Sequence, residues 1–196
     1  MSDSEGPGKA PAPRRRQPLK ATPEKLRNSA LYYLERYDTS SEHLRRRLHQ
    51  KIQLSAKVHG TDPEEGAAAV ERLIARFTEL GLLDDVRFAR EQVRRLLARG
   101  TSSAMIRNRL RAKGLTAELI DAALAADEAG GAGRELRAAL RYARRRRLGP
   151  YRLDDRAERR DRDLAALGRQ GFDFETARRV IDCEDPARLE AAADEE

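Results

Sequence analysis

The chain has 196 residues, of which 37% are charged, and it carries a formal net charge of +7. Only 5% of the residues are aromatic, none is Trp, and Ala, Leu, Arg and Glu dominate, which favours helices over strands. A single cysteine, Cys183, excludes an intrachain disulfide, and no run approaches the ~18 apolar residues of a membrane span, so we expect a soluble cytoplasmic protein.

The two ends of the chain differ from its middle. Residues 1–22 hold four prolines and the cluster Arg14-Arg15-Arg16, which predicts a disordered basic arm. Residues 184–196 hold six acids and one arginine, a net charge of −5, and are expected to form an acidic tail. The charge of +12 that remains on residues 1–183 indicates a polyanionic partner or a protein with an acidic surface.

Residues 23–81 are predicted to form three helices. Thr22 and Pro23 are typical of a helix start, and the polar run 38–41 caps a second helix. A looser, longer connector is expected over 54–65, where Pro63 begins the third helix.

A helix stop followed by a helix start marks the junction after residue 81. Gly81 can take the left-handed conformation that ends a helix, and Leu83 folds apolar surface back. Asp84 or Asp85 can cap the next helix, in which Phe88 points inward. We expect these residues to set the angle between helical units without contacting a binding partner themselves.

The same organisation is predicted for residues 82–129 and 130–183. Three helices in 82–129 are separated at Gly100-Thr101-Ser102-Ser103 and at Gly114. The glycines at 130, 131 and 133 read as a linker, because they follow a helix and lack the spacing of a nucleotide-binding loop. Three further helices follow, with a break at Gly171 and a last helix through Ile181.

An internal repeat links these segments. The stretches Leu110–Glu118 and Leu167–Glu175 share one pattern: apolar, three residues, Gly, apolar, capping residue, one residue, Glu. The pattern predicts an all-α fold of three tandem three-helix repeats that form an elongated, curved crescent.

The hinge at 81–89, the repeat at 110–115 and the opening Ala30-Leu31-Tyr32-Tyr33-Leu34 resemble the RecX family of RecA regulators. The resemblance covers about 24–182. It implies a crescent that binds as a monomer in the helical groove of the RecA filament on single-stranded DNA. It also implies that the protein modulates filament assembly, ATP turnover, strand exchange and coprotease activity, within homologous recombination, DNA repair and the SOS response.

No catalytic or cofactor motif is present. His43 and His49 are six residues apart and do not share a helix face as a zinc pair would, and no cysteine lies near them. We therefore expect no enzyme activity, metal or cofactor, and any ATP hydrolysed in the complex would be hydrolysed by RecA.

Basic residues on helix surfaces are the candidate contacts to DNA or RecA. The set comprises Arg45, Arg46, Arg47, Lys51, Arg95, Arg99, Arg107, Arg109, Arg111, Lys113, Arg137, Arg141, Arg144 and Arg145, the last four on the outer side of their helix. Arginines in such ladders suit phosphate or carboxylate, although a solvated face balanced by nearby acids fits each single residue equally well. The same residues are compatible with an independent helical module that binds bare DNA without RecA, or with a protein scaffold.

Overall fold

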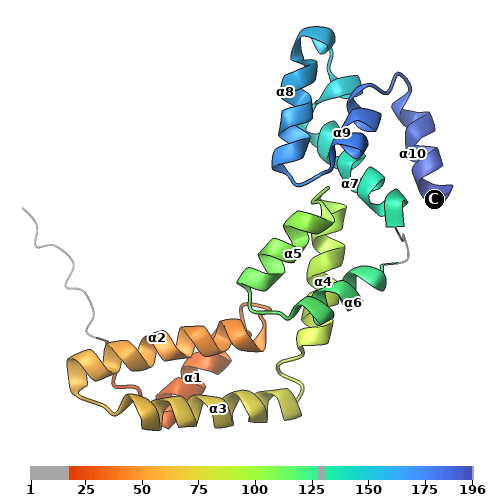
Figure 1. Ribbon diagram of the computed structural model, residues 1–196. Helices are drawn as coiled ribbons and strands as arrows, with labels where there is room; N and C mark the ends of the chain where they lie inside the picture. Colours follow the sequence, from red (N-terminus) through yellow and green to blue (C-terminus); the bar gives the residue numbers. More distant parts are fainter. Residues whose placement is uncertain (1–17, 128–130, 196) are drawn as a thin grey trace, which may run out of the picture.

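The computed structural model describes residues 18–127 and 131–195, and this part contains helices and no strand. The first unit comprises α1 (Pro23–Leu34), α2 (Ser41–His59) and α3 (Pro63–Glu79), and the second α4 (Asp85–Ala98), α5 (Ser103–Ala112) and α6 (Ala117–Ala125). The third comprises α7 (Gly131–Arg146), the short 3-10 helix η1 (Gly149–Tyr151), α8 (Arg156–Arg169) and α9 (Phe174–Ile181), and α10 (Pro186–Glu195) follows it. The predicted all-α arrangement of tandem three-helix repeats in an elongated, curved body is confirmed (Figure 1).

Side-chain caps begin most of these helices at the residues that the sequence indicates. Ser40, Asp84 and Ser102 each accept a hydrogen bond from the backbone N–H three residues later, as Thr22, Thr116 and Asp173 also do. A cap satisfies an amide that has no partner within the helix and contributes about 1 kcal/mol. Helix starts in this chain are therefore determined locally.

The apolar residues gather in two cores. The first unit has its own core, built around Leu44, Leu48 and Ile52 of α2 and closed by Leu83, which is 2% exposed. The second and third units share one continuous core, to which Phe88 of α4 and Leu140 of α7 both belong. The peptide between Gly81 and Asp84 thus packs back onto the unit that it leaves.

The prediction of a longer connector over 54–65 is wrong, because α2 continues to His59 and only residues 60–62 separate it from α3. Ser55 is fully buried, and its hydroxyl accepts hydrogen bonds from Ala21 N (2.9 Å) and Thr61 Oγ1 (2.9 Å). Gly60 then ends the helix at φ +63°. A buried serine interrupts the apolar periodicity without interrupting the helix.

Two expectations for the ends of the chain also change. Residues 1–17 of the predicted basic arm lie outside the described residues, but 18–21 lie along α2, where the Nε2–H of His59 donates to Pro18 O (2.6 Å). The predicted acidic tail contains α10, which packs on α7 and buries Ala193 completely. Ala and Leu on one face of α10 supply the apolar surface that its acidic composition conceals.

The glycine linker expected at 130–133 is shorter than predicted, since α7 already begins at Gly131. Residues 128–130 lie outside the described part of the chain. Over the described residues, none of the helices has the length and apolar character needed to cross a bilayer.

Candidate nucleic-acid interface at the inter-unit joints

The same joint connects the first unit to the second and the second to the third. The hydroxyl of Ser40, at the start of α2, donates to the carbonyl of Lys113 at the end of α5 (2.5 Å). Ser102, 62 residues later at the start of α5, donates in the same way to the carbonyl of Gln170 at the end of α8. Both serines are completely buried, so each joint closes on a hydrogen bond shielded from water.

A carboxylate completes each joint. Asp85 accepts a hydrogen bond from Ser41 N (2.8 Å), and Glu135 accepts one from Ser103 N (2.7 Å). Each acid therefore caps a helix of the preceding unit. Asp85 of the hinge thus links the first unit to the second, while Asp84 caps α4 through Arg87 N (2.9 Å) as predicted.

Close backbone approach at the joints requires glycine. Gly114 and Gly171 both have φ of +84°, and a Cβ on them would lie 2.1 Å from Glu42 Cγ and 2.8 Å from Ser102 Oγ. Gly81 also has a positive φ, +68°, but a Cβ there would meet nothing within 4 Å. Gly114 and Gly171 are therefore joint residues, whereas Gly81 only reverses the chain.

Aromatic and basic side chains gather beside the first joint, in a group that we call the joint patch: Tyr33, Tyr37, His43, Arg47 and Lys113. The rings of Tyr33 and Tyr37 have centroids 4.9 Å apart, and the Arg47 guanidinium lies 4.3 Å from the Tyr33 ring centroid. Tyr37 is exposed. Exposed aromatic rings beside cations are the side chains on which single-stranded bases stack.

His43 lies within this positive environment. Partial burial lowers its pKa below the ordinary value of 6.5, and the positive charges of Lys113, Arg47 and Arg46 lower it further. The imidazole is therefore neutral at pH 7, and its ring lies 6.3 Å from that of Tyr33. The joint patch thus offers three rings and two cations.

The equivalent edge of the second unit carries arginines. Arg95, Arg99 and Arg109 occupy the positions 62 residues after Tyr33, Tyr37 and Arg47. All three are exposed, and within the described residues none of their side chains forms a hydrogen bond or ion pair. Because the two joints share their contacts, equivalent positions recur along one edge of the molecule.

The other predicted residues of the first two units divide into paired and unpaired groups. Arg45 binds Glu42 and Glu71, Arg46 binds Glu42 and the carbonyl of Ala112, and Arg107 pairs with Asp121 at 2.8 Å. Arg111 is exposed and has no ion pair among the described residues, while Lys51 lies further along α2, beside α1. The structure therefore brings Arg47 and Lys113 together but leaves Lys51 apart.

Among the predicted arginines of α7, Arg141, Arg144 and Arg145 are exposed, whereas Arg137 is half-buried. The guanidinium of Arg137 donates to Ala193 O, and Arg144 lies 3.6 Å from the Glu190 carboxylate, so both contact α10. Arg141 donates to Leu97 O on α4 (3.4 Å), and Arg145 lies over the Tyr142 ring. The prediction of an outer face is therefore wrong only for Arg137, which α10 partly covers.

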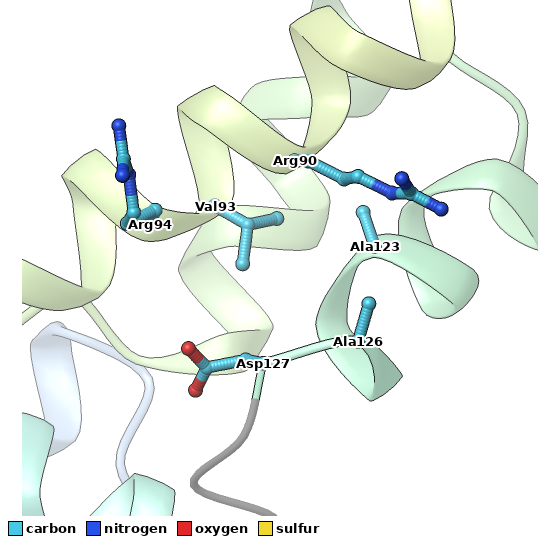
Figure 2. A pocket seen from close by; sticks show the side chains of 6 residues that line it. All are labelled: Arg90, Val93, Arg94, Ala123, Ala126 and Asp127. Carbon is cyan, nitrogen blue, oxygen red and sulfur yellow. The ribbon is translucent and has the colours of Figure 1, made fainter.

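A groove between α4 and α6 adds two arginines that the sequence interpretation omitted. It measures about 400 Å³ and is lined by Arg90, Val93, Arg94, Ala123, Ala126 and Asp127 (Figure 2). Arg90 extends from α4 toward α6, whereas Arg94 points the other way and pairs with Glu91 at 2.6 Å. Their i, i+4 spacing on the polar face of α4 was the signal in the sequence that could have identified them.

The described residues contain no group of three His, Cys, Asp or Glu side chains placed to hold a metal ion. Cys183 is a free, partly buried thiol. The chemistry that this site offers is thus stacking, hydrogen bonding and charge.

Comparison with known proteins agrees with these units. The model of the second three-helix domain of RecX matches residues 84–124, the span of α4 to α6. The regulatory protein RecX of Myxococcus xanthus is 41% identical over 90% of this chain and 95% of its own length. Those of Stenotrophomonas maltophilia strain R551-3 and Agrobacterium fabrum are 34% and 30% identical, over 92% and 79% of this chain and 96% and 80% of their own. The chain therefore belongs to the RecX family of regulatory proteins.

Proposed function

We propose that this protein binds the RecA filament on single-stranded DNA, lies in the helical groove of that filament, and modulates its assembly. Modulation extends to ATP turnover, strand exchange and coprotease activity, and the role is not catalytic because RecA itself hydrolyses the ATP. The proposal rests on membership of the RecX family and on one structural observation, the repetition of the joint.

The repeated joint favours a repetitive partner. Side chains that recur at equivalent positions of successive units can meet equivalent sites on successive subunits of a filament. A single globular partner would not present repeated sites that match these repeated positions. Bound DNA supplies a polyanion along the same axis, which suits the excess of positive charge.

Along this edge, the first and second units offer different side chains to the partner. At the joint patch, Tyr37 and Tyr33 offer ring faces to unstacked bases, and Lys113 offers a charge to the adjoining phosphate. On the second unit, Arg95, Arg99 and Arg109 can bind phosphates of the DNA or carboxylates of RecA in a bidentate manner.

Binding to filaments and to bare DNA can be compared directly. Fluorescein-labelled protein, followed by anisotropy, is expected to bind RecA filaments on single-stranded DNA more tightly than the same DNA without RecA. Equal affinity for both would instead identify an independent nucleic-acid-binding module, which the aromatic joint patch could also serve.

Variants of the second unit test the contacts. Replacing Arg95 and Arg99 together by Ala should flatten the slope of log K against log [salt] by about 1–2, because each phosphate contact contributes about one unit. Arg76→Ala is the control, since Arg76 is also exposed but pairs with Glu79 on α3. An unchanged slope in the double variant would show that these arginines are solvated and do not contact phosphate.

A further inference from the structure

The first unit carries a second groove, away from the joints and with a different chemistry. It measures about 530 Å³ and lies between α1, α2 and the segment 18–21. We name it the lysine groove after Lys20, Lys25 and Lys51, which line it together with Leu19, Tyr32 and Leu54.

The wall of the lysine groove is fixed in place. Ala21 N donates to the buried hydroxyl of Ser55, and the Nε2–H of His59 donates to Pro18 O. These two bonds hold 18–21 along α2, and the partly buried Ala21 packs against the core of the first unit. The groove is therefore a feature of the folded unit.

Apolar side chains remain exposed in this groove. Leu19 is 75% exposed, Tyr32 62% and Leu54 47%. Three large apolar residues gathered in one concave surface are typical of an interaction site, whereas apolar residues scattered singly over a surface need no explanation.

The charges that border the lysine groove have one sign and one side-chain type. The chain has 34 arginines and only six lysines, yet three of those lysines line the groove and no arginine does. Among the described residues that line it, none is acidic, and the three lysines form no ion pair with a described carboxylate. A ligand with negative charge would therefore meet three available ammonium groups.

We propose that the lysine groove binds an acidic peptide segment in which carboxylates alternate with large apolar side chains. The apolar side chains would contact Leu19, Tyr32 and Leu54, while the carboxylates would pair with the lysines. Flexible ammonium groups accept carboxylates in many geometries, because a point charge does not require the bidentate alignment of a planar guanidinium. Two of the three apolar residues, Leu19 and Leu54, are aliphatic and offer no ring face on which a base could stack, which favours a peptide over a nucleic acid.

The probe is a fluorescein-labelled peptide in which Glu and Asp alternate with Leu and Phe, measured by anisotropy against the full-length protein. We expect it to bind, and to bind more weakly when its acids are replaced by Lys or its apolar residues by Ser. Higher salt should weaken binding, because exposed ion pairs are screened.

Lys51→Glu and Lys57→Glu are matched variants on the same helix with the same change of net charge. Lys57 is exposed but does not line the groove. Lys51→Glu should weaken peptide binding about fivefold and Lys57→Glu should not, since a lost exposed pair costs up to about 1 kcal/mol. Leu54→Ser, at a residue outside the core, should weaken it as well.

Three results would overturn the proposal. The first is equal weakening by both lysine variants, which would show only an effect of net charge. The second is no binding of the peptide at all. The third is binding of oligothymidylate that Lys51→Glu abolishes while peptide binding is unchanged, which would assign the groove to nucleic acid.

Discussion

Asp163 is the one charged residue that the described fold buries almost completely, at 1% exposed. Its carboxylate accepts two hydrogen bonds from Arg152 (2.7 and 2.8 Å) and one from Gly149 N (2.9 Å). Burial alone would raise its pKa, but the bonds from Arg152 and Gly149 outweigh burial and lower the pKa below the ordinary value of 3.8. Asp163 therefore connects α8 to η1 as an anion.

Asp163→Asn should lower the free energy of unfolding by about 2–3 kcal/mol at pH 7, because it leaves Arg152 without its anion. A lowered folded-state pKa gives stability that is present above the unfolded pKa and is lost as the pH falls through the folded pKa. Urea titrations at pH 7 and pH 3 should thus show a smaller difference between variant and wild type at pH 3. A difference that does not change with pH would contradict the role of the charge.

Gly100 and Gly81 form a matched pair of left-handed glycines, at φ of +69° and +68°. A Cβ on Gly100 would lie 2.5 Å from Tyr142 N and 2.7 Å from Ala138 O, which are backbone atoms of α7. Gly81→Ala should cost only the backbone strain, about 1 kcal/mol, whereas Gly100→Ala should cost about 3 kcal/mol because α4 and α7 must separate. Equal midpoints in urea would contradict this close approach.

For single residues, the sequence predicted those roles that depend only on the residue's own helix, such as capping it or ending it. The caps Ser40, Asp84 and Thr116 and the turns at Gly114 and Gly171 follow from local rules and are confirmed. The bond of Asp85 to Ser41 was not predictable, because the two residues are 44 positions apart and either aspartate could cap α4.

The joint serines act between elements as well as within them. The Ser102 hydroxyl accepts from Met105 N (3.1 Å) as the cap of α5 and donates to the carbonyl of Gln170 on α8. Thr116 caps α6 through Leu119 N (3.3 Å), and its other side-chain contact is to Glu118 of the same helix. Ser102 therefore differs from Thr116 in having a partner in another unit.

Ser102→Ala should lower the free energy of unfolding by about 2 kcal/mol, twice the cost of Thr116→Ala, because it also leaves the carbonyl of Gln170 without its bond. Denaturant unfolding of the two variants makes the comparison. Equal losses would show that the bond between units adds nothing to stability.

Helix α10 is the element that the sequence interpretation missed most clearly. Its acids suggested a tail, but Glu190 accepts from the Tyr151 hydroxyl (2.9 Å) and lies beside Arg144. Burial, and then Glu190, raise the pKa of Tyr151 above its ordinary value. Only the packing of Ala193 and Leu189 on the shared core reveals the helix as part of the fold.

Glu190→Gln should keep the hydrogen bond to Tyr151 but remove the carboxylate charge that pairs with Arg144. We expect DNA binding to tighten and the slope of log K against log [salt] to steepen by about 0.9, as for one added phosphate contact. Glu184→Gln removes the same charge at an exposed position and should leave the slope as it is. A slope that Glu190→Gln leaves unchanged would mean that α10 does not restrain Arg144.

For the whole molecule, the number of units and their helical class were predictable, since both depend on periodicity and on a repeated turn. The distribution of unpaired charge over the surface was not predictable from the sequence, because ion pairing depends on which helices pack together. Arg107 pairs with Asp121 across α5 and α6, and Arg137 lies under α10, whereas Arg95 and Arg99 remain exposed. A list of basic residues therefore overstates the surface that is available to a partner.

Regulation of RecA is tested most directly by ATP turnover on single-stranded DNA. RecA filaments are titrated with this protein, and a different ATPase that depends on single-stranded DNA is titrated in parallel. We predict a change in RecA turnover at substoichiometric protein, with no change for the other ATPase. Unaltered RecA turnover, or equal effects on both enzymes, would contradict a role specific to the RecA filament.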